Sequence, residues 1–273
     1  MRLIVFSKML KDLGIAELID FAQELGIEGY DMAVRPGYPV NPDNVEEALP
    51  DAVAQFRTKG LDIPMVTAHG NLLQPDAEGE GLLAAMDAAD VRRLKLGYFK
   101  FIPDQMDYWD EVGKARAALE GWSLLAQKYN VRVCYHTHSQ RCLGLNAGTL
   151  SHMIRGFDPQ RIGAFIDAGH LRAEGEEFDV AVAIVREHLS MVAVKDFLLE
   201  RVDKENHGAV RRRVVEAGQG MCDWTAVFSE LKRIGFDGPV SIHCEFEVEP
   251  SDMMDAIRRE VSFFRSLKEK IGA

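Results

Sequence analysis

The sequence predicts one α/β domain, residues 1–273, folded as a single (β/α)8 barrel, a TIM barrel. First, a length of 273 residues suits a fold that needs roughly 250. Second, short apolar runs alternate eight times with longer amphipathic segments, without a break in composition. Third, four successive runs end in titratable side chains, which is typical of strand ends that form a barrel's active site. A doubly wound open sheet is the alternative, but eight repeats and polar strand ends favour closure.

Eight short apolar runs are the strand candidates. Several are continuous rather than alternating, as expected for strands that are buried on both faces of a parallel sheet. The predicted strands are Arg2–Phe6, Gly29–Met32, Ile63–Thr67, Tyr98–Ile102, Arg132–His136, Gly163–Asp167, Met191–Lys195 and Val240–Cys244.

Amphipathic segments between these runs predict helices. Gly26, Gly60 and Gly235 follow three of them and predict left-handed helix stops. Asp223 and Ser251 are expected N-caps, since their oxygens can accept the free N–H groups of a first turn. The predicted helices are Ile15–Leu25, Asn44–Lys59, Gly81–Leu96, Tyr108–Tyr129, Ala147–Arg155, Phe178–His188, Asp223–Ile234 and Ser251–Ile271.

Two connections exceed the usual two to six residues. One is Ala33–Asp43, which carries Arg35, a candidate for binding substrate. The other is Asp196–Cys222, predicted as a long loop after the seventh strand. Long loops on the functional face of a barrel often act as lids or substrate clamps.

The strand ends supply candidates for chemistry. Alternate residues of a strand share a face, so His136 should point with His138, and His243 with Glu245. Asp167 ends one strand and His170 lies on the turn after it, while Lys195 ends the next strand. Buried ionisable groups need partners or a function, so their repetition on one predicted face indicates an active site. The alternative is a purely structural role, in which the Asp167 carboxylate caps the next turn.

His69 and Lys100 are further candidates for the rim, where they and His138 would contact substrate. His69 lies just beyond the third predicted strand and has a structural alternative, a simple hydrogen bond. Lys100 lies inside the fourth predicted strand and has the alternative of pairing with a carboxylate inside the barrel.

Composition excludes several classes of function. The net charge of −11 disfavours nucleic acid as a partner, and only Arg211–Arg213 form a basic run. No apolar stretch approaches the roughly 20 residues of a membrane span, and the N-terminal apolar run is too short for a signal peptide. The four cysteines contain no CxxC pair, which fits a protein of the reducing cytoplasm. The sequence has no GxxxxGK[ST], GxGxxG, GxSxG or HExxH motif, so no nucleotide cofactor is expected.

At these residues the chain resembles the sugar isomerase/epimerase family with the xylose-isomerase-like TIM barrel. The resemblance runs the whole length of the chain, and the Asp-x-Gly-His and Lys-Asp pieces are its characteristic parts. The matching stretches are Gly26–Gly37, Tyr135–Ser139, Asp167–His170 with Glu174-Gly175, Val194–Phe197, Gly218–Trp224 and Gly238–Glu245.

The resemblance implies one divalent metal held by Glu, Asp, His and Glu on strands five to eight. Of these only Asp167 is retained, because the other three positions align with His136, Ala193 and His243. His170 matches the substrate-contacting His of the family. Two imidazoles and one carboxylate, His136, His243 and Asp167, suit a transition metal better than a hard cation. A divalent metal (Mn, Zn, Fe or Mg) and a metal-free site in which Lys195 supplies the positive charge both remain open.

The activity that the resemblance implies is removal of a proton next to the carbonyl of a sugar or keto-sugar, as in an isomerase or epimerase. Glu245 or His136 would be the base, His170 and Lys195 the donors to the oxyanion, and His243 a ligand or second acid/base. A keto-sugar lyase or hydratase is the main alternative, and a non-catalytic sugar-binding derivative is another. An apurinic endonuclease is disfavoured, since its zinc cluster needs more ligands. The expected partner is a small carbohydrate, with a homo-oligomer left open.

Overall fold

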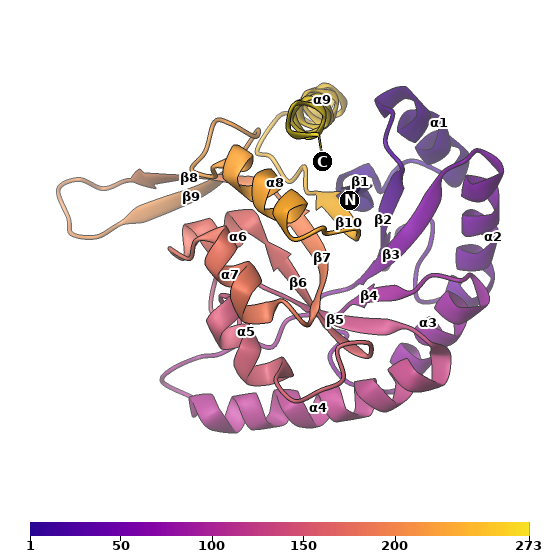
Figure 1. The fold of residues 1–273 in the computed structure, drawn as a ribbon, viewed down its shortest axis with the longest axis horizontal. Coiled ribbons are helices and arrows are strands. Elements are labelled where there is room, and N and C mark those ends of the chain that lie inside the picture. The colour runs from indigo at the N-terminus through magenta and orange to yellow at the C-terminus, as the bar shows by residue number, and fades with distance from the viewer. Residues whose placement is uncertain (273) are drawn as a thin grey trace.

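The computed structural model describes residues 1–272. Eight parallel strands close into a barrel in the order β1-β10-β7-β6-β5-β4-β3-β2, which confirms the barrel and rules out the open sheet (Figure 1). The barrel strands are β1 Arg2–Phe6, β2 Gly29–Val34, β3 Asp62–Ala68, β4 Arg93–Lys95, β5 Arg132–His136, β6 Ile162–Asp167, β7 Leu189–Val194 and β10 Pro239–Ile242.

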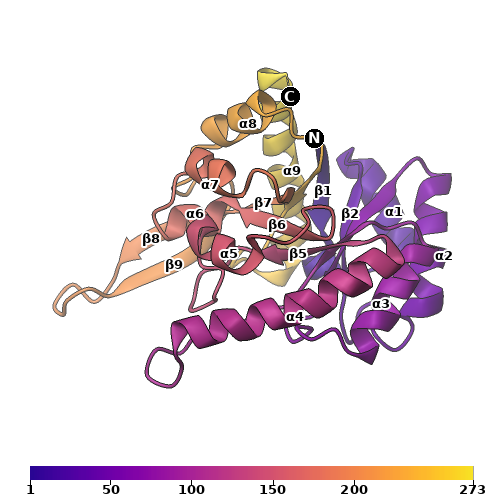
Figure 2. The same cartoon turned by 60° about the horizontal axis from the view of Figure 1, so that its bottom comes forward.

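Helices surround the barrel and cover its outer face (Figures 1 and 2). None of those in residues 1–272 is both long and apolar enough to cross a membrane. The helices are α1 Ile15–Leu25, α2 Val45–Thr58, α3 Ala77–Ala88, α4 Tyr108–Tyr129, α5 Ala147–Ile154, α6 Ala168–Ala173, α7 Phe178–Val185, α8 Trp224–Arg233 and α9 Met253–Ile271, with the 3-10 turns η1 Ser7–Leu10 and η2 Pro250–Asp252.

The helix ends follow the predicted chemistry with one exception. Gly26, Gly60 and Gly235 all have positive φ, as their places after α1, α2 and α8 require. The Asp223 carboxylate accepts the N–H of Ala226 and so caps α8. Ser251 is not an N-cap, because it lies within η2 and α9 begins two residues later.

Two apolar layers flank the strands. The outer layer lies between strands and helices and forms the main core. A smaller cluster fills the barrel itself: Ile4, Met65, Cys134, Phe165, Met191 and Ala193. Because directly paired residues of neighbouring strands share a face, this cluster fixes which side chains point inward.

The register places a polar layer inside the barrel, toward the carboxyl ends of the strands. Lys95 pairs with inward-facing Cys134, and His136 pairs with inward-facing Phe165. Asp167 pairs in the same way with inward-facing Ala193. The interior therefore changes from apolar to titratable along the barrel axis, at the end where such barrels carry active sites.

The fourth strand was wrongly predicted. It is Arg93–Lys95, a three-residue strand between β3 and β5, whereas Tyr98–Ile102 contains no strand beyond a single bridge from Lys100 to Cys142. The predicted helix to Leu96 ran over the true strand, since α3 ends at Ala88. The strand is too short to show a period of its own, and its two basic residues fit a helical pattern.

The segment predicted as a loop after the seventh strand contains an antiparallel hairpin, β8 Asp196–Arg201 and β9 Val210–Val215. The hairpin projects away from the barrel (Figures 1 and 2). Each arginine of the basic run pairs with a carboxylate: Arg211 and Arg213 with Glu200 across the hairpin, and Arg212 with Glu174. Asp196 fixes the base of the hairpin, because its buried carboxylate accepts hydrogen bonds from the backbone of Gly218, Gly220 and Cys222 and from the Trp224 indole.

Candidate active site

Three groups from three strand ends form the charged centre of the barrel mouth. Lys195 Nζ lies 2.6 Å from Glu245 Oε2 and 3.6 Å from Asp167 Oδ2. Burial favours the neutral amine, but the charges of the two carboxylates outweigh it and raise the pKa of Lys195. Burial likewise opposes ionisation of Glu245, yet Lys195, His243 and Lys8 hold its pKa well below the usual value. The pair is therefore an ammonium beside a carboxylate.

Two buried imidazoles face the Asp167 carboxylate. His136 Nε2 lies 3.7 Å and His170 Nε2 3.9 Å from Asp167 Oδ2. Burial, together with the nearby lysine charges, lowers the pKa of each imidazole well below its ordinary value. Both rings are therefore neutral near pH 7, the form in which an imidazole can accept a proton.

The other ring nitrogens orient these imidazoles. His136 Nδ1 lies 2.8 Å from the hydroxyl oxygen of Tyr98, and His170 Nδ1 lies 2.8 Å from the hydroxyl oxygen of Ser139. The carboxylate of Asp167 also accepts the backbone N–H of His170, so it caps α6 as well as facing the site. Asp167 therefore caps a helix, as the structural alternative expects, and also belongs to the charged cluster.

His243 has a different environment. Its Nε2 lies 3.8 Å from Asp31 Oδ2 and its Nδ1 3.8 Å from Glu245 Oε2, and its ring lies on Phe6. Burial disfavours the imidazolium, but the two flanking carboxylates outweigh it and raise the pKa of His243. The pKa values of the imidazoles in the site are therefore shifted in opposite directions: downward for His136 and His170, and upward for His243.

Several atoms at the centre lack a protein partner. Within residues 1–272, buried His136 Nε2, His170 Nε2, His243 Nε2 and Asp167 Oδ2 have no hydrogen-bond partner. Nearly all buried polar atoms in proteins are paired, so a group of four such atoms indicates a place for a polar ligand. A compound with several oxygens, such as a sugar, matches this mixture of donors and acceptors.

The predicted metal-ligand set is not formed. In the part of the chain that the structure describes, no three His, Cys, Asp or Glu side chains are placed to hold a metal ion. His243 faces Asp31 rather than Asp167, and the Lys195 ammonium lies beside the one retained acidic ligand. A divalent cation would have to displace that ammonium. His136, Asp167 and His243 as arranged here do not fit the metal.

Two of the residues predicted to bind substrate, His138 and Arg35, lie in the walls of the barrel mouth. The His138 ring lies 4.0 Å from that of His170 and 4.3 Å from that of Tyr98, measured between centroids. The Arg35 guanidinium lies 5.4 Å from the centre of the Phe6 ring. Lys8 forms an ion pair with Glu245 at the outer edge of the cluster.

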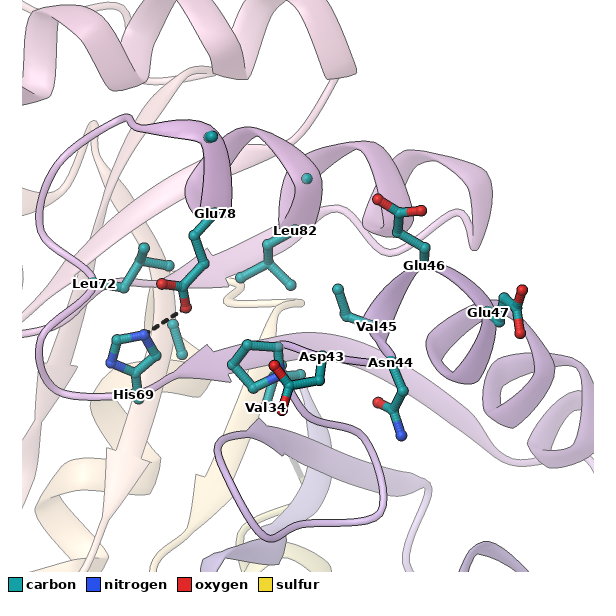
Figure 3. A pocket seen from close by; sticks show the side chains of 14 residues that line it. Val34, Asp43, Asn44, Val45, Glu46, Glu47, His69, Leu72, Glu78 and Leu82 are labelled. Atoms are coloured by element: carbon teal, nitrogen blue, oxygen red, sulfur yellow. Dashed lines mark hydrogen bonds and ion pairs between the residues drawn. The ribbon is translucent and has the colours of Figure 1, made fainter.

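Lys100 and His69 lie apart from the charged centre. Lys100 is exposed, donates to the Cys142 sulfur at 3.2 Å and pairs with no carboxylate among residues 1–272. His69 Nε2 lies 2.7 Å from Glu78 Oε1 (Figure 3). This pair lines a cavity of about 460 Å³ between the ends of β2 and β3 and helices α2 and α3. His69 thus makes a structural hydrogen bond, the alternative to substrate binding, and lies outside the charged cluster.

Three residues of the site were missed from the sequence. Lys95 lies in the segment whose pattern predicts a helix, so the sequence does not show its inward position. Asp31 lies in the middle of β2, where its hydrogen bond to Ser241 Oγ at 2.9 Å is visible only in three dimensions. Tyr98 had been placed inside a strand as an apolar residue. Of the three, only Asp31 carried a usable signal, as a lone acid in an apolar run.

The chain is a closed barrel with a group of ionisable residues at its strand ends, where enzymes of this fold carry their active sites. Residues 19–267 match the family described as xylose isomerase-like TIM barrel, and the chain belongs to that family. An inosose dehydratase of Lacticaseibacillus casei is 21% identical over 143 residues, which are 50% of this chain and 48% of that protein. The matched segment therefore spans about half the length of this curated relative.

Solved structures share the fold over nearly the whole chain. The apo form of 3-keto-D-glucoside 4-epimerase YcjR from E. coli superposes with a TM-score of 0.76 and 16% identity, covering 97% of this chain and 99% of that one. The IolI protein with a bound zinc atom superposes with a TM-score of 0.75 and 15% identity, covering 98% and 99%. At such identities the likeness concerns the fold.

Proposed function

We propose that this protein is a sugar isomerase or epimerase that removes a proton from the carbon next to the carbonyl of a sugar or keto-sugar. The observation that carries the proposal is the placing of neutral His136 and His170 opposite the Lys195 ammonium, around four buried polar atoms without partners. Such chemistry needs a base and a positive group for the enolate oxygen, and the mouth holds both.

His136 is the base in this proposal. When Nδ1 donates its N–H to the Tyr98 oxygen, Nε2 presents a free lone pair at the centre of the site. Lys195 stabilises the developing oxyanion, because its two carboxylates keep it charged. Glu245, held as a carboxylate by Lys195, positions that ammonium rather than taking the proton, since its lowered pKa makes it a weak base.

The proton is returned by a second group. In an epimerase it comes to the opposite face of the same carbon, and in an isomerase to its neighbour. His243 is the donor in this scheme, because the carboxylates of Asp31 and Glu245 favour its protonated form. No step is assigned to a metal, since the three candidate ligands do not fit one here.

Dehydration is the second candidate. Loss of a hydroxyl group next to the enolate needs one base and one acid, and the opposite pKa shifts of His136 and His243 match that requirement. The relation to an inosose dehydratase over half the chain favours the same reaction.

The test is proton exchange in D2O, followed by NMR with inososes, 3-keto-glucosides and ketohexoses. We expect deuterium to enter the carbon next to the carbonyl of a substrate, with retention of its oxygens in an epimerase and loss of water in a dehydratase. His136→Ala should slow exchange by at least about 100-fold. His152→Ala, which alters an exposed histidine of α5, is the control. Binding without exchange would instead indicate a sugar-binding protein.

A further inference from the structure

A second buried lysine lies in the barrel mouth, and the scheme above does not use it. Lys95 ends β4, and its pairing with Thr67 and Cys134 turns its side chain into the barrel. The residue is only 2% exposed. The charges that act on its amine come from Arg35, Asp31, Glu245 and Lys195, so the amine belongs to the same group of side chains.

The surroundings of Lys95 differ from those of Lys195. Lys195 has two carboxylates within 4 Å, whereas none of the ion pairs within residues 1–272 includes Lys95. Its amine lies instead over the ring of Tyr98, 3.7 Å from the centroid. An aromatic ring stabilises an ammonium less than a carboxylate does. Burial, assisted by the charge of Arg35, lowers the pKa of Lys95 to about 7. A substantial share of the amine is thus unprotonated at neutral pH.

Burial that leaves a lysine amine partly unprotonated activates it as a nucleophile toward carbonyl groups. We propose that Lys95 forms a Schiff base with the carbonyl carbon of the substrate. This proposal rests on the proposed function in one respect, that the substrate has a ketone or aldehyde group. The cationic C=N bond, rather than the Lys195 ammonium, then activates the neighbouring C–H, and it does so in place of the metal whose ligands are not formed.

The steps balance without an oxidant or reductant. The nitrogen lone pair of Lys95 attacks the carbonyl carbon, and the carbonyl oxygen receives a proton from His243. The nitrogen, now an ammonium, loses one proton to give a neutral carbinolamine, and that proton is transferred to the carbinolamine hydroxyl. The hydroxyl then leaves as water, and a cationic C=N bond remains. That cation acidifies the neighbouring C–H, from which His136 removes the proton. After the carbon is reprotonated, water adds to the C=N bond, and the collapse of the carbinolamine releases product and free Lys95 and returns one proton to His243.

The test is reduction of the protein by sodium borohydride in the presence of the carbonyl compounds named above. Reduction converts the C=N bond to a stable secondary amine, which mass spectrometry locates by peptide mapping. We expect one substrate-sized addition per chain, on Lys95. Lys95→Arg and Lys95→Met should abolish it, whereas Lys11→Met, at an exposed lysine, should leave it unchanged. Circular dichroism checks that the variants fold. The position of the adduct in the unaltered protein is found by peptide mapping without any variant.

The same samples are assayed for proton exchange, which separates the two proposals. Exchange without addition, or with addition on another lysine, would overturn the role of Lys95 and leave the proposed function standing. Addition on Lys95 without exchange would support the Schiff base and refute the isomerase, epimerase and dehydratase assignments. Neither addition nor exchange with any of the compounds would count against both.

Discussion

Lys195 Nζ lies 2.6 Å from Glu245 Oε2, although 50 residues separate them in the chain and the lysine is only 4% exposed. The contact joins the ends of two neighbouring strands of the barrel, β7 and β10. A buried charge without its partner is strongly destabilising. The pair that holds the ammonium in the site therefore also stabilises the contact between these two strand ends.

Removing Glu245 should therefore lower both stability and activity. Glu245→Ala leaves the Lys195 ammonium with Asp167 alone, and we expect the free energy of unfolding, measured in urea, to fall by about 3 kcal/mol. Lys128→Met, which breaks an exposed pair with Glu80, should have a much smaller effect on the free energy of unfolding. A similar small loss for Glu245→Ala would show that the pair is not buried in solution.

Stability should fall when the pH drops below about 6.5. Burial, with smaller charge effects, lowers the folded-state pKa of His136, His138 and His170, that of His138 to about 3. Below the ordinary imidazole pKa the unfolded chain binds protons that the folded chain does not, so protonation favours unfolding. Each such imidazole contributes a slope of up to about 1.4 kcal/mol per pH unit.

Urea titrations between about pH 6.5 and 4.5 measure this slope. His138→Gln removes one of the three imidazoles and should make the slope shallower. Glu245, whose folded pKa is also lowered, adds to the loss as the pH falls through and below about 4.5. A slope unchanged by His138→Gln would mean that this ring is protonated in the folded protein.

The fold was predictable because most strands carry their own signal. Continuous apolar runs such as β5 and β6 were found within a residue of their observed bounds. β4 was not, because its stability comes from pairing with β3 and β5 rather than from its own three residues. The hairpin β8–β9 was missed for a related reason, since its strands are largely solvent-facing and carry the basic run Arg211–Arg213.

The site was predictable where strands end in paired polar residues, and less so elsewhere. His136, Asp167, Lys195 and Glu245 are brought together as the register of a barrel implies. The opposite pKa shifts of His136 and His243 depend in part on Asp31, which lies on β2, two strands away from β10, the strand that His243 follows. Such an effect depends on distances that no single segment of sequence contains.

Tyr98 should orient the base. Its hydroxyl group is the partner of His136 Nδ1, and burial keeps its pKa well above the ordinary value, so it stays a phenol. Tyr98→Phe removes a hydrogen bond worth about 1 kcal/mol and should lower kcat by roughly fivefold with little change in KM. Tyr108→Phe removes the similar contact with His152 Nδ1 on the outside of the barrel and should leave kcat unchanged. Equal effects of the two changes would argue against a role for Tyr98 in orienting His136.

Activity should survive removal of metal ions. Lys195 lies beside Asp167, and no three His, Cys, Asp or Glu side chains in the described part of the chain are placed to hold a metal ion. We expect elemental analysis of the purified protein to find far less than one transition-metal ion per chain, and dialysis against a chelator to leave proton exchange intact. A stoichiometric ion whose removal stops exchange would mean that Lys195 moves away when the site is loaded.

Gly169 should be essential for the position of Lys195. A Cβ at this residue would lie 2.1 Å from the backbone oxygen and 3.0 Å from Cγ of Lys195, so alanine would push the end of β7 away from α6. Gly169→Ala should lower the free energy of unfolding by about 2 kcal/mol, as overpacking does, and should reduce kcat because the ammonium shifts relative to Asp167. Gly113→Ala is the matched control, since nothing lies within 4 Å of its Cβ on exposed α4. That change should raise stability by about 0.5 to 1 kcal/mol without affecting kcat. If Gly169→Ala kept full activity in a folded protein, the ammonium would not need the place that the structure gives it.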